Sequence, residues 1–264
     1  MGDIAPTVRT SLEPHGLRVE SVEFRQNTFR DEFGYTRALK KAVEAFGPKV
    51  VFPIGNPLAL SRYKSSLPAG VTAAVEDEDK ITILDRKVPF SCLMSELGVR
   101  QPHFYASAEE AEGRDVIFKR DISFGGQGVH RPWNVAALKN LIAHQSPGEP
   151  YLIEDFIEGE DWSVDAVRFD DFFRAGAYKV LSANGKGPSL QRRVSEFPAL
   201  TDIAHAILDH LDYKGVCGFD FRVDAAGLPY ILEANPRFTG GIATQIESGF
   251  DIPYLIWKGF ANDV

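Results

Sequence analysis

The side chains best suited to chemistry are the carboxylates of Asp220 and Glu233 and the amide of Asn235, near the C-terminal end of the chain. Each carboxylate lies within or beside a short apolar and aromatic run, at residues 216–223 and 230–234. The four residues after the first run are Asp-Ala-Ala-Gly, which is a turn composition. Two such runs joined by a turn are typical of a β-hairpin. The sequence therefore predicts a hairpin that carries two acids.

The position of the turn decides which residues oppose each other across this hairpin. A turn centred between Ala226 and Gly227 pairs Phe221 with Leu232 and Asp220 with Glu233. It also places Asn235 on the same face as Glu233. Directly opposed like charges repel. Two carboxylates and an amide oxygen on one patch of sheet suit a hard divalent cation, most simply Mg²⁺ that holds phosphates.

Two alternatives to the metal site stay open at this point. The hairpin could be an ordinary one whose acids point to solvent. A register slip of one residue would also place the two acids on opposite faces. The apolar residues that closely bracket the acids favour the metal site over a solvated hairpin.

A second candidate site follows a short predicted strand at residues 115–119. Lys119 ends that strand, and a loop with Ser123, Gly125, Gly126 and Gly128 follows at once. Glycines let backbone N–H groups approach an anion closely, and the lysine supplies a positive charge for phosphate. The loop matches neither the P-loop nor the dinucleotide-binding pattern. A plain turn is the alternative, and the lysine-ended strand favours a phosphate loop.

Three further residues are weaker candidates when they are taken alone. Lys87 lies at the entrance to a predicted helix, where a surface lysine is the default interpretation. Glu154 and Asp161 flank the turn at Glu158 and Gly159. They could receive an adenine amino group and ribose hydroxyls, but their spacing alone favours an ordinary acidic hairpin loop.

The elements that must position these residues alternate between helical and extended patterns. Predicted helices span residues 33–46, 57–66, 87–97, 133–145, 198–211 and 252–260. Predicted strands span residues 17–24, 49–54, 115–119, 172–181, a pair within 151–169, and the hairpin. The polar, glycine-containing residues 182–195 are expected to form a flexible connection or a substrate lid. This alternation predicts an α/β protein.

Composition excludes several classes of protein. The chain has 264 residues, of which 44% are hydrophobic and 25% charged, with a formal net charge of −8. That acidic balance argues against a general nucleic-acid binder. No apolar run approaches the roughly 20 residues that cross a bilayer, and the first residues lack the apolar core of a signal peptide. Two cysteines suit a reducing compartment. We therefore expect a cytoplasmic protein without nucleic-acid or membrane partners.

Four segments, in this order along the chain, resemble the ATP-grasp superfamily, particularly its carbamoyl-phosphate-synthetase-like and biotin-carboxylase-like branches. They are Asp85-RK with Gly98-VRQP, Phe118-KRDISFGGQGV, Ile153-EDFIEGEDWSVD, and Gly218-FDF with Leu232-EANPRFTGG. The resemblance runs from about Asp85 to the C-terminus, and its last motif is the most specific.

The resemblance implies an α/β (α+β) architecture in which two α+β subdomains grip ATP. Residues 1–84 would be a shortened N-terminal α/β region and residues 85–264 the ATP-grasp domain. Within that domain, the lid subdomain would span about 103–156 and the metal and phosphate subdomain about 157–264. The N-terminal region is about one βα unit shorter than in the superfamily. Its missing substrate contacts would be absent or would come from elsewhere, for example a second copy in a homodimer or a partner chain.

The resemblance also implies a role for each matching residue. Lys87 and Lys119 correspond to phosphate-binding lysines, and the loop from Ser123 through Gly125 and Gly126 to Gly128 corresponds to the lid over the phosphates. The adenine-binding edge corresponds to Glu154, Asp155 and Ile157, and the ribose-binding acid to Asp161. The Mg²⁺ ligands correspond to Asp220, Glu233 and Asn235, with Mn²⁺ as an alternative ion. Arg237 corresponds to a basic residue beside the transferred phosphoryl group.

The expected function is that of an ADP-forming carboxylate–amine ligase. ATP would phosphorylate a small carboxylate, and an amine or similar nucleophile would attack the resulting acyl phosphate. Lys179, Arg192 and Arg193 are candidates for binding the carboxylate, with solvated loop cations as the alternative. An ATP-grasp kinase that releases a phosphorylated product and a non-catalytic nucleotide-binding subunit are the competing hypotheses.

Overall fold

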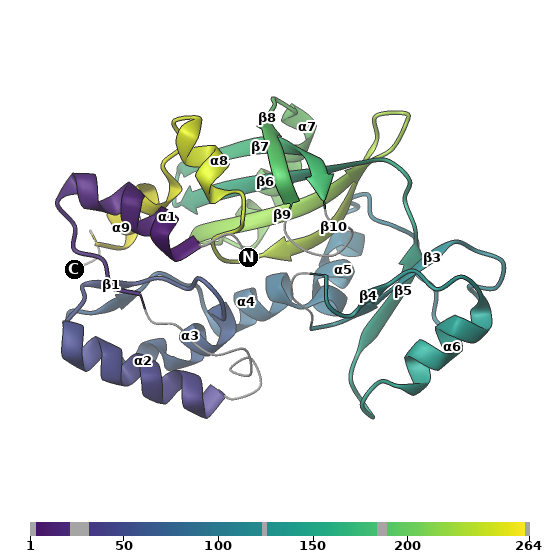
Figure 1. Cartoon of the computed structure of the whole chain (residues 1–264), viewed down its shortest axis with the longest axis horizontal. Helices are drawn as coiled ribbons and strands as arrows, with labels where there is room; N and C mark the ends of the chain where they lie inside the picture. Colours follow the sequence, from purple (N-terminus) through teal and green to yellow (C-terminus); the bar gives the residue numbers. More distant parts are fainter. Residues whose placement is uncertain (1–3, 22–31, 123–125, 184–188, 262–264) are drawn as a thin grey trace.

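A five-stranded antiparallel sheet forms the centre of the molecule in the computed structural model, which describes residues 4–21, 32–122, 126–183 and 189–261 (Figure 1). The strand order is β10-β9-β6-β7-β8. The strands are β6 (Glu160–Phe169), β7 (Phe172–Ala183), β8 (Ser189–Val194), β9 (Gly215–Val223) and β10 (Pro229–Asn235). All four pairings are antiparallel.

The two faces of this sheet differ in chemistry because side chains alternate along each strand. On one face, Val164, Phe219 and Phe221 are buried in the main hydrophobic core. This core also includes apolar side chains of α7 (Pro198–His210) and of the α3–α5 region. The other face carries Ser163, Asp165 and Asp220, which follow the same alternation. We call this polar side the ligand face.

A smaller three-stranded sheet with one helix forms a second layer, on the right in Figure 1. Its strand order is β4-β3-β5, with β3 at Val116–Arg120, β4 at Val129–His130 and β5 at Tyr151–Asp155. Helix α6 (Val135–Ala143) covers one side, where Leu138 packs with Phe118 and other buried apolar residues. Its core is therefore separate from that of the larger sheet.

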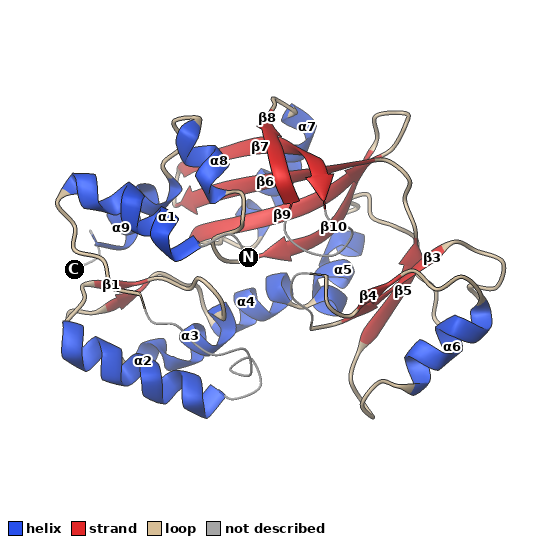
Figure 2. Cartoon of the chain, in the orientation of Figure 1, coloured by secondary structure: helices blue, strands red, loops and turns tan. Residues whose placement is uncertain are grey.

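The N-terminal part of the chain packs against the larger sheet and the C-terminal helices (Figure 2). It contains α1 (Ile4–Leu12), η1 (Glu13–His15), α2 (Glu32–Phe46), β1 (Val50–Val51), α3 (Pro57–Tyr63), η2 (Lys64–Ser66), β2 (Thr72–Ala73), α4 (Glu78–Asp85) and α5 (Lys87–Glu96). The C-terminal helices are α8 (Ile242–Glu247) and α9 (Ile252–Ala261). Val8 and Leu12 of α1 share a buried cluster with Phe250 and Ile256. Within the described residues, no helix is long and apolar enough to span a membrane.

Most predicted elements are present, and several predictions were wrong. Residues 17–21, the described part of the predicted strand at 17–24, have no regular structure. The expected loop at 182–195 contains β8, which pairs with β7. Helices α1, α4 and α8 were not predicted, because helices this short show no clear period. The parallel pair β1–β2 encloses α3, one helix further along the chain than the expected unit.

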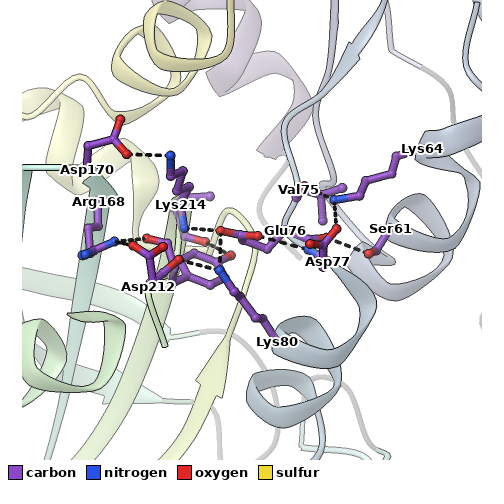
Figure 3. A network of polar contacts seen from close by, with 12 residues as sticks. Ser61, Lys64, Val75, Glu76, Asp77, Lys80, Arg168, Asp170, Asp212 and Lys214 are labelled. Atoms are coloured by element: carbon purple, nitrogen blue, oxygen red, sulfur yellow. Dashed lines mark hydrogen bonds and ion pairs between the residues drawn. The ribbon is translucent and has the colours of Figure 1, made fainter. Parts of the chain in front are cut away.

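A buried carboxylate connects the N-terminal part to the larger sheet (Figure 3). Glu76 is only 9% exposed. Its Oε1 accepts the Lys214 backbone N–H at 2.6 Å and lies 3.3 Å from Lys80 Nζ, and its Oε2 accepts the Asp77 N–H at 3.1 Å. Lys80 also donates to the Asp212 carbonyl at 2.5 Å. Glu76 therefore satisfies backbone donors on both sides of the junction.

Replacing this carboxylate should weaken the whole fold. Glu76→Ala leaves two backbone N–H groups and an ammonium without their partner, so we expect a loss of about 2 kcal/mol or more in unfolding free energy. Urea denaturation measures it. The matched control is Glu78→Ala, which removes an exposed partner of Arg62 and should cost less than about 1 kcal/mol. Equal losses in the two variants would contradict the role of Glu76.

Candidate functional site

Asp220 and Glu233 oppose each other directly across β9 and β10, as the sequence predicted. The predicted partner of Phe221 was wrong: Phe221 opposes Ile231 instead of Leu232. The turn pairs Val223 with Pro229, one residue away from the expected register, and a β-bulge between Ile231 and Glu233 restores it. The bulge therefore places both acids on the ligand face.

Hydrogen bonds fix the Asp220 carboxylate from two sides. Ser163 Oγ donates to its Oδ1 at 2.6 Å, and Asn235 Nδ2 lies 3.3 Å from its Oδ2. Arg237 Nη2 donates to Asn235 Oδ1 at 2.8 Å. The structure thus brings together the three side chains that the sequence singled out, with Arg237 directly beside them.

Charge is unevenly shared between the two acids. Burial and the neighbouring charge of Glu233 raise the pKa of Asp220 to about 7. Burial would also raise the pKa of Glu233, but the Lys87 and Lys119 ammonium groups outweigh it and lower that pKa. Lys87 Nζ lies 3.1 Å from Glu233 Oε2. Glu233 is therefore the ionised member of the pair.

Two buried lysines come to the site from different elements. Lys87 begins α5 and is 7% exposed, and Lys119 near the end of β3 is 6% exposed. Lys119 Nζ pairs with Glu154 Oε1 at 2.5 Å. Burial raises the pKa of Glu154, and the charge of Lys119 opposes the rise. Buried ammonium groups are costly unless they face negative charge, and here Glu233 and Glu154 supply that charge.

Asp121 joins the two lysine-bearing elements. Its Oδ1 accepts the Val88 backbone N–H at 2.8 Å, and its Oδ2 lies 3.6 Å from Arg86 Nη1. The carbonyl of Asp121 also accepts the Lys87 N–H at 3.4 Å. The start of α5 is therefore fixed to the end of β3, which holds Lys87 and Lys119 in one region. The sequence analysis did not identify Asp121.

The donor set fits a hard cation with a polyphosphate. Asp220, Glu233 and Asn235 offer oxygen donors of the kind that Mg²⁺ prefers. Burial, and after it the charge of Glu233, raises the pKa of Asp220, and a bound cation would favour the ionised form. In the part of the chain that the structure describes, no three His, Cys, Asp or Glu side chains form a metal cluster. A cation here would need phosphate oxygens or water to complete its coordination.

The other predicted nucleotide-binding residues are divided between the two sheets. Ser123 and Gly125 lie outside the described residues; Gly126 and Gly128 have φ of 75° and 82°, which favours glycine. The Asp155 carboxylate, at the end of β5, accepts the Tyr105 hydroxyl at 2.6 Å. Ile157 lies just beyond the end of this strand. Asp161 lies on β6 of the larger sheet and pairs with Arg222 at 2.9 Å.

Lys179 and Arg193 do not join this cluster. They oppose each other on β7 and β8, and Lys179 also opposes Trp162, on the face opposite to Asp220. Lys179 Nζ pairs with Glu160 Oε1 at 2.6 Å. Alternation along β8 puts Arg192 on the ligand face, where its guanidinium lies near the Tyr178 ring. We therefore withdraw Lys179 and Arg193 and retain Arg192.

Sequence reasoning missed other polar residues of the ligand face. Ser163, Asp165 and Tyr178 lie on the same face of the sheet as Asp220, and Asp85 is near enough to Arg237 for its charge to matter. Burial raises the pKa of Asp85, and the charge of Arg237 opposes the rise. The alternation of Ser163 and Asp165 with apolar residues was a signal that could have found two of them.

The pKa of Asp220 gives a test of this geometry. In the unfolded chain an aspartate has a pKa of about 3.9, so the folded state binds the extra proton and loses stability as pH rises from about 4 to about 7. In metal-free protein, Asp220→Asn should be more stable than wild type near pH 8 and equal to it near pH 4. Thermal unfolding across pH measures the difference. A variant that is less stable than wild type at pH 8 would contradict the charge assignment.

Comparisons with known proteins agree with the fold and with its C-terminal motifs. The family described as "ATP-grasp in the biosynthetic pathway with Ter operon" matches residues 148–264. The large chain of carbamoyl phosphate synthase from Thermoanaerobacter sp. is 24% identical over 209 residues, which cover 71% of this chain and 19% of that protein. The corresponding protein of Pyrobaculum aerophilum is 27% identical over 263 residues, which cover 88% of this chain and 26% of that protein. The chain thus spans only a minor part of these relatives.

Solved structures match over nearly the whole chain. Biotin carboxylase from Campylobacter jejuni superimposes with a TM-score of 0.79 at 17% identity, covering 98% of this chain and 68% of that chain. L-amino acid ligase from Bacillus licheniformis gives 0.72 at 16% identity, covering 97% of this chain and 71% of that chain. The chain has the ATP-grasp fold, and its C-terminal part matches an ATP-grasp family model.

Proposed function

We propose that this chain is a Mg²⁺- and ATP-dependent ligase that activates a small carboxylate as an acyl phosphate, with release of ADP, for attack by an amine or similar nucleophile. The observation that carries the proposal is the meeting of two buried lysines, Lys87 and Lys119, with the opposed acids Asp220 and Glu233. The carbamoyl phosphate synthase relatives and the biotin carboxylase and amino acid ligase folds support it.

The charges of the site suit phosphoryl transfer. Asp220, Glu233 and Asn235 would hold Mg²⁺, which when bound would neutralise phosphate charge. Lys87 and Lys119 would bind phosphate oxygens that replace their present carboxylate partners. Positioning and charge stabilisation supply nearly all of the catalysis in such reactions.

Arg237 is the proposed group beside the transferred phosphoryl. It holds Asn235 Oδ1 at 2.8 Å through one nitrogen, and the other donates to the Phe238 carbonyl at 3.1 Å. A guanidinium fixed at two points meets a developing negative charge without reorganising. Arg192 is the residue proposed to bind the carboxylate substrate, because it lies on the same face of the sheet as Asp220.

The remaining nucleotide contacts would come from the smaller sheet and from the start of β6. Glu154, with the backbone of Asp155 and Ile157, would bind adenine, and Asp161 would bind ribose after leaving Arg222. The glycines of the loop from Ser123 through Gly125 and Gly126 to Gly128 would approach the phosphates. We keep residues 103–156 as the proposed lid and residues 1–84 as the proposed N-terminal region.

The class of acid and the setting are further parts of the proposal. The fold match to an L-amino acid ligase favours an amino acid or peptide-like acid as substrate. A homodimer or a partner chain could complete the substrate site, and one matched biotin carboxylase domain is described as a dimer. A cytoplasmic location suits a consumer of ATP.

The experiment that tests the function is ADP release with Mg-ATP across a panel of carboxylic and amino acids, singly and in pairs, with hydroxylamine present. ADP that depends on one acid, together with a hydroxamate, is the expected result. A stable phosphorylated product without hydroxamate would favour a kinase. Nucleotide binding with no ADP release from any pair would favour a non-catalytic binding subunit.

Glu233→Gln should lower the rate of acid-dependent ADP release by about 100-fold or more while the fold stays intact. The neutral amide of glutamine cannot balance the positive charge of the cation or of Lys87. Steady-state ADP assays and circular dichroism measure the two quantities. The matched control is Glu160→Gln, which breaks an exposed ion pair with Lys179 on the other side of the sheet and should leave the rate unchanged. Near-normal turnover in Glu233→Gln would refute the metal assignment.

A further inference from the structure

A chain of polar side chains lies on the ligand face and ends at a buried carboxylate that the proposed function does not use. Asp165 lies on β6 and is 1% exposed. Its Oδ1 accepts the Thr239 hydroxyl at 2.6 Å. Thr239 Oγ1 in turn accepts the Gly241 backbone N–H at 3.0 Å. One buried carboxylate thus sets the orientation of the hydroxyl that holds the residues after Arg237.

The turn at residues 237–241 is in close contact with the sheet. Gly218 of β9 opposes Asp165, and a Cβ on Gly218 would lie 2.1 Å from Thr239 Cγ2. A Cβ on Gly241 would lie 2.1 Å from the Tyr178 hydroxyl. Glycine at both positions therefore lets the turn lie directly against the strands.

The Tyr178 hydroxyl extends this chain toward the acid pair. Burial raises the pKa of Tyr178, as do the charges of Asp165 and Asp220, and hydrogen bonding with Thr239 and Ser163 opposes the rise. Ser163 Oγ donates to Asp220 Oδ1 at 2.6 Å. The polar groups therefore follow one another from Asp165 through Thr239, Tyr178 and Ser163 to Asp220.

We propose that Asp165 is a positioning residue: through Thr239 it fixes the turn that carries Arg237, and through Tyr178 and Ser163 it couples the position of that turn to Asp220. The coupling rests on the proposed function, because it takes Asp220 as a metal ligand. The anchoring of the turn does not rest on it.

The geometry indicates what this coupling would do. Asn235, at the end of β10, donates to Asp220 and accepts from Arg237, so the turn and the hairpin share one side chain. The chain from Asp165 to Asp220 on the same face connects them a second time. Two connections should restrict Arg237 to one position relative to Asp220, as a preorganised site requires.

The test uses the whole chain and variants that do not touch the acid pair. Thr239→Val keeps the shape of the side chain and removes the hydroxyl, Thr239→Ser keeps the hydroxyl, and Asp165→Asn removes the charge that the hydroxyl faces. The control is Thr201→Val, which removes a hydroxyl bonded to the Pro198 carbonyl on α7. Two quantities are measured: the exchange rate of the Gly241 amide hydrogen by NMR, and the Kd for Mn²⁺ with ATP by electron paramagnetic resonance.

Thr239→Val should exchange the Gly241 amide about tenfold faster and weaken Mn²⁺ binding several-fold, which is about the effect of one hydrogen bond. Asp165→Asn should change both in the same direction, and the double variant should be no worse than Thr239→Val, since the two residues act through one bond. Thr239→Ser and Thr201→Val should resemble wild type. A role in folding alone would not weaken Mn²⁺ binding.

Three results would overturn the proposal: unchanged amide exchange in both single variants, fully additive effects in the double variant, or unchanged Mn²⁺ affinity in Thr239→Val. If wild-type protein binds no Mn²⁺ with ATP, the proposed function fails separately. Amide exchange then decides the anchoring alone: faster, non-additive exchange supports it and unchanged exchange overturns it.

Discussion

The repulsion between two opposed carboxylates is the constraint on which the rest of this structure depends. Asp220 and Glu233 face each other on adjacent strands, an arrangement that costs stability unless positive charge compensates it. Lys87 supplies part of that charge at 3.1 Å, and burial together with the charge of Glu233 still raises the pKa of Asp220. Further positive charge beside this pair would stabilise its ionised form, which supports the proposed cation with its anionic ligand.

The fold supports this site by dividing one sheet into two chemically different faces. Phe219 and Phe221 bury the core side of β9, so Asp220 between them must point the other way. The smaller sheet then brings Lys119 toward the same face, and Asp121 fixes the start of α5 beside it. Stability comes mainly from the apolar face, which leaves the polar face free to hold charges that a core would exclude.

Local patterns in the sequence predicted most of the elements and the opposition of Asp220 and Glu233. They did not predict the strand register, the face on which some cations lie, or the long-range contacts. The bulge near Leu232 has no signal in the hairpin, because two different combinations of turn and bulge give the same acid pair. The face of Lys179 and Arg193 depended on β8, a strand whose polar composition favours a loop. The contact of Lys87 with Glu233 joins residues far apart in the chain, and only the tertiary structure or the family resemblance could reveal it.

Paramagnetic broadening by Mn²⁺ tests the central claim most directly. In the wild-type chain with ATP, substoichiometric Mn²⁺ should broaden the backbone NMR signals of Asp220, Glu233 and Asn235 and leave those around Trp133, an exposed residue just before α6, unchanged. Broadening that requires ATP and is centred on the hairpin is the result that the account predicts. Broadening centred elsewhere, or none at the hairpin at saturating ATP, would contradict it.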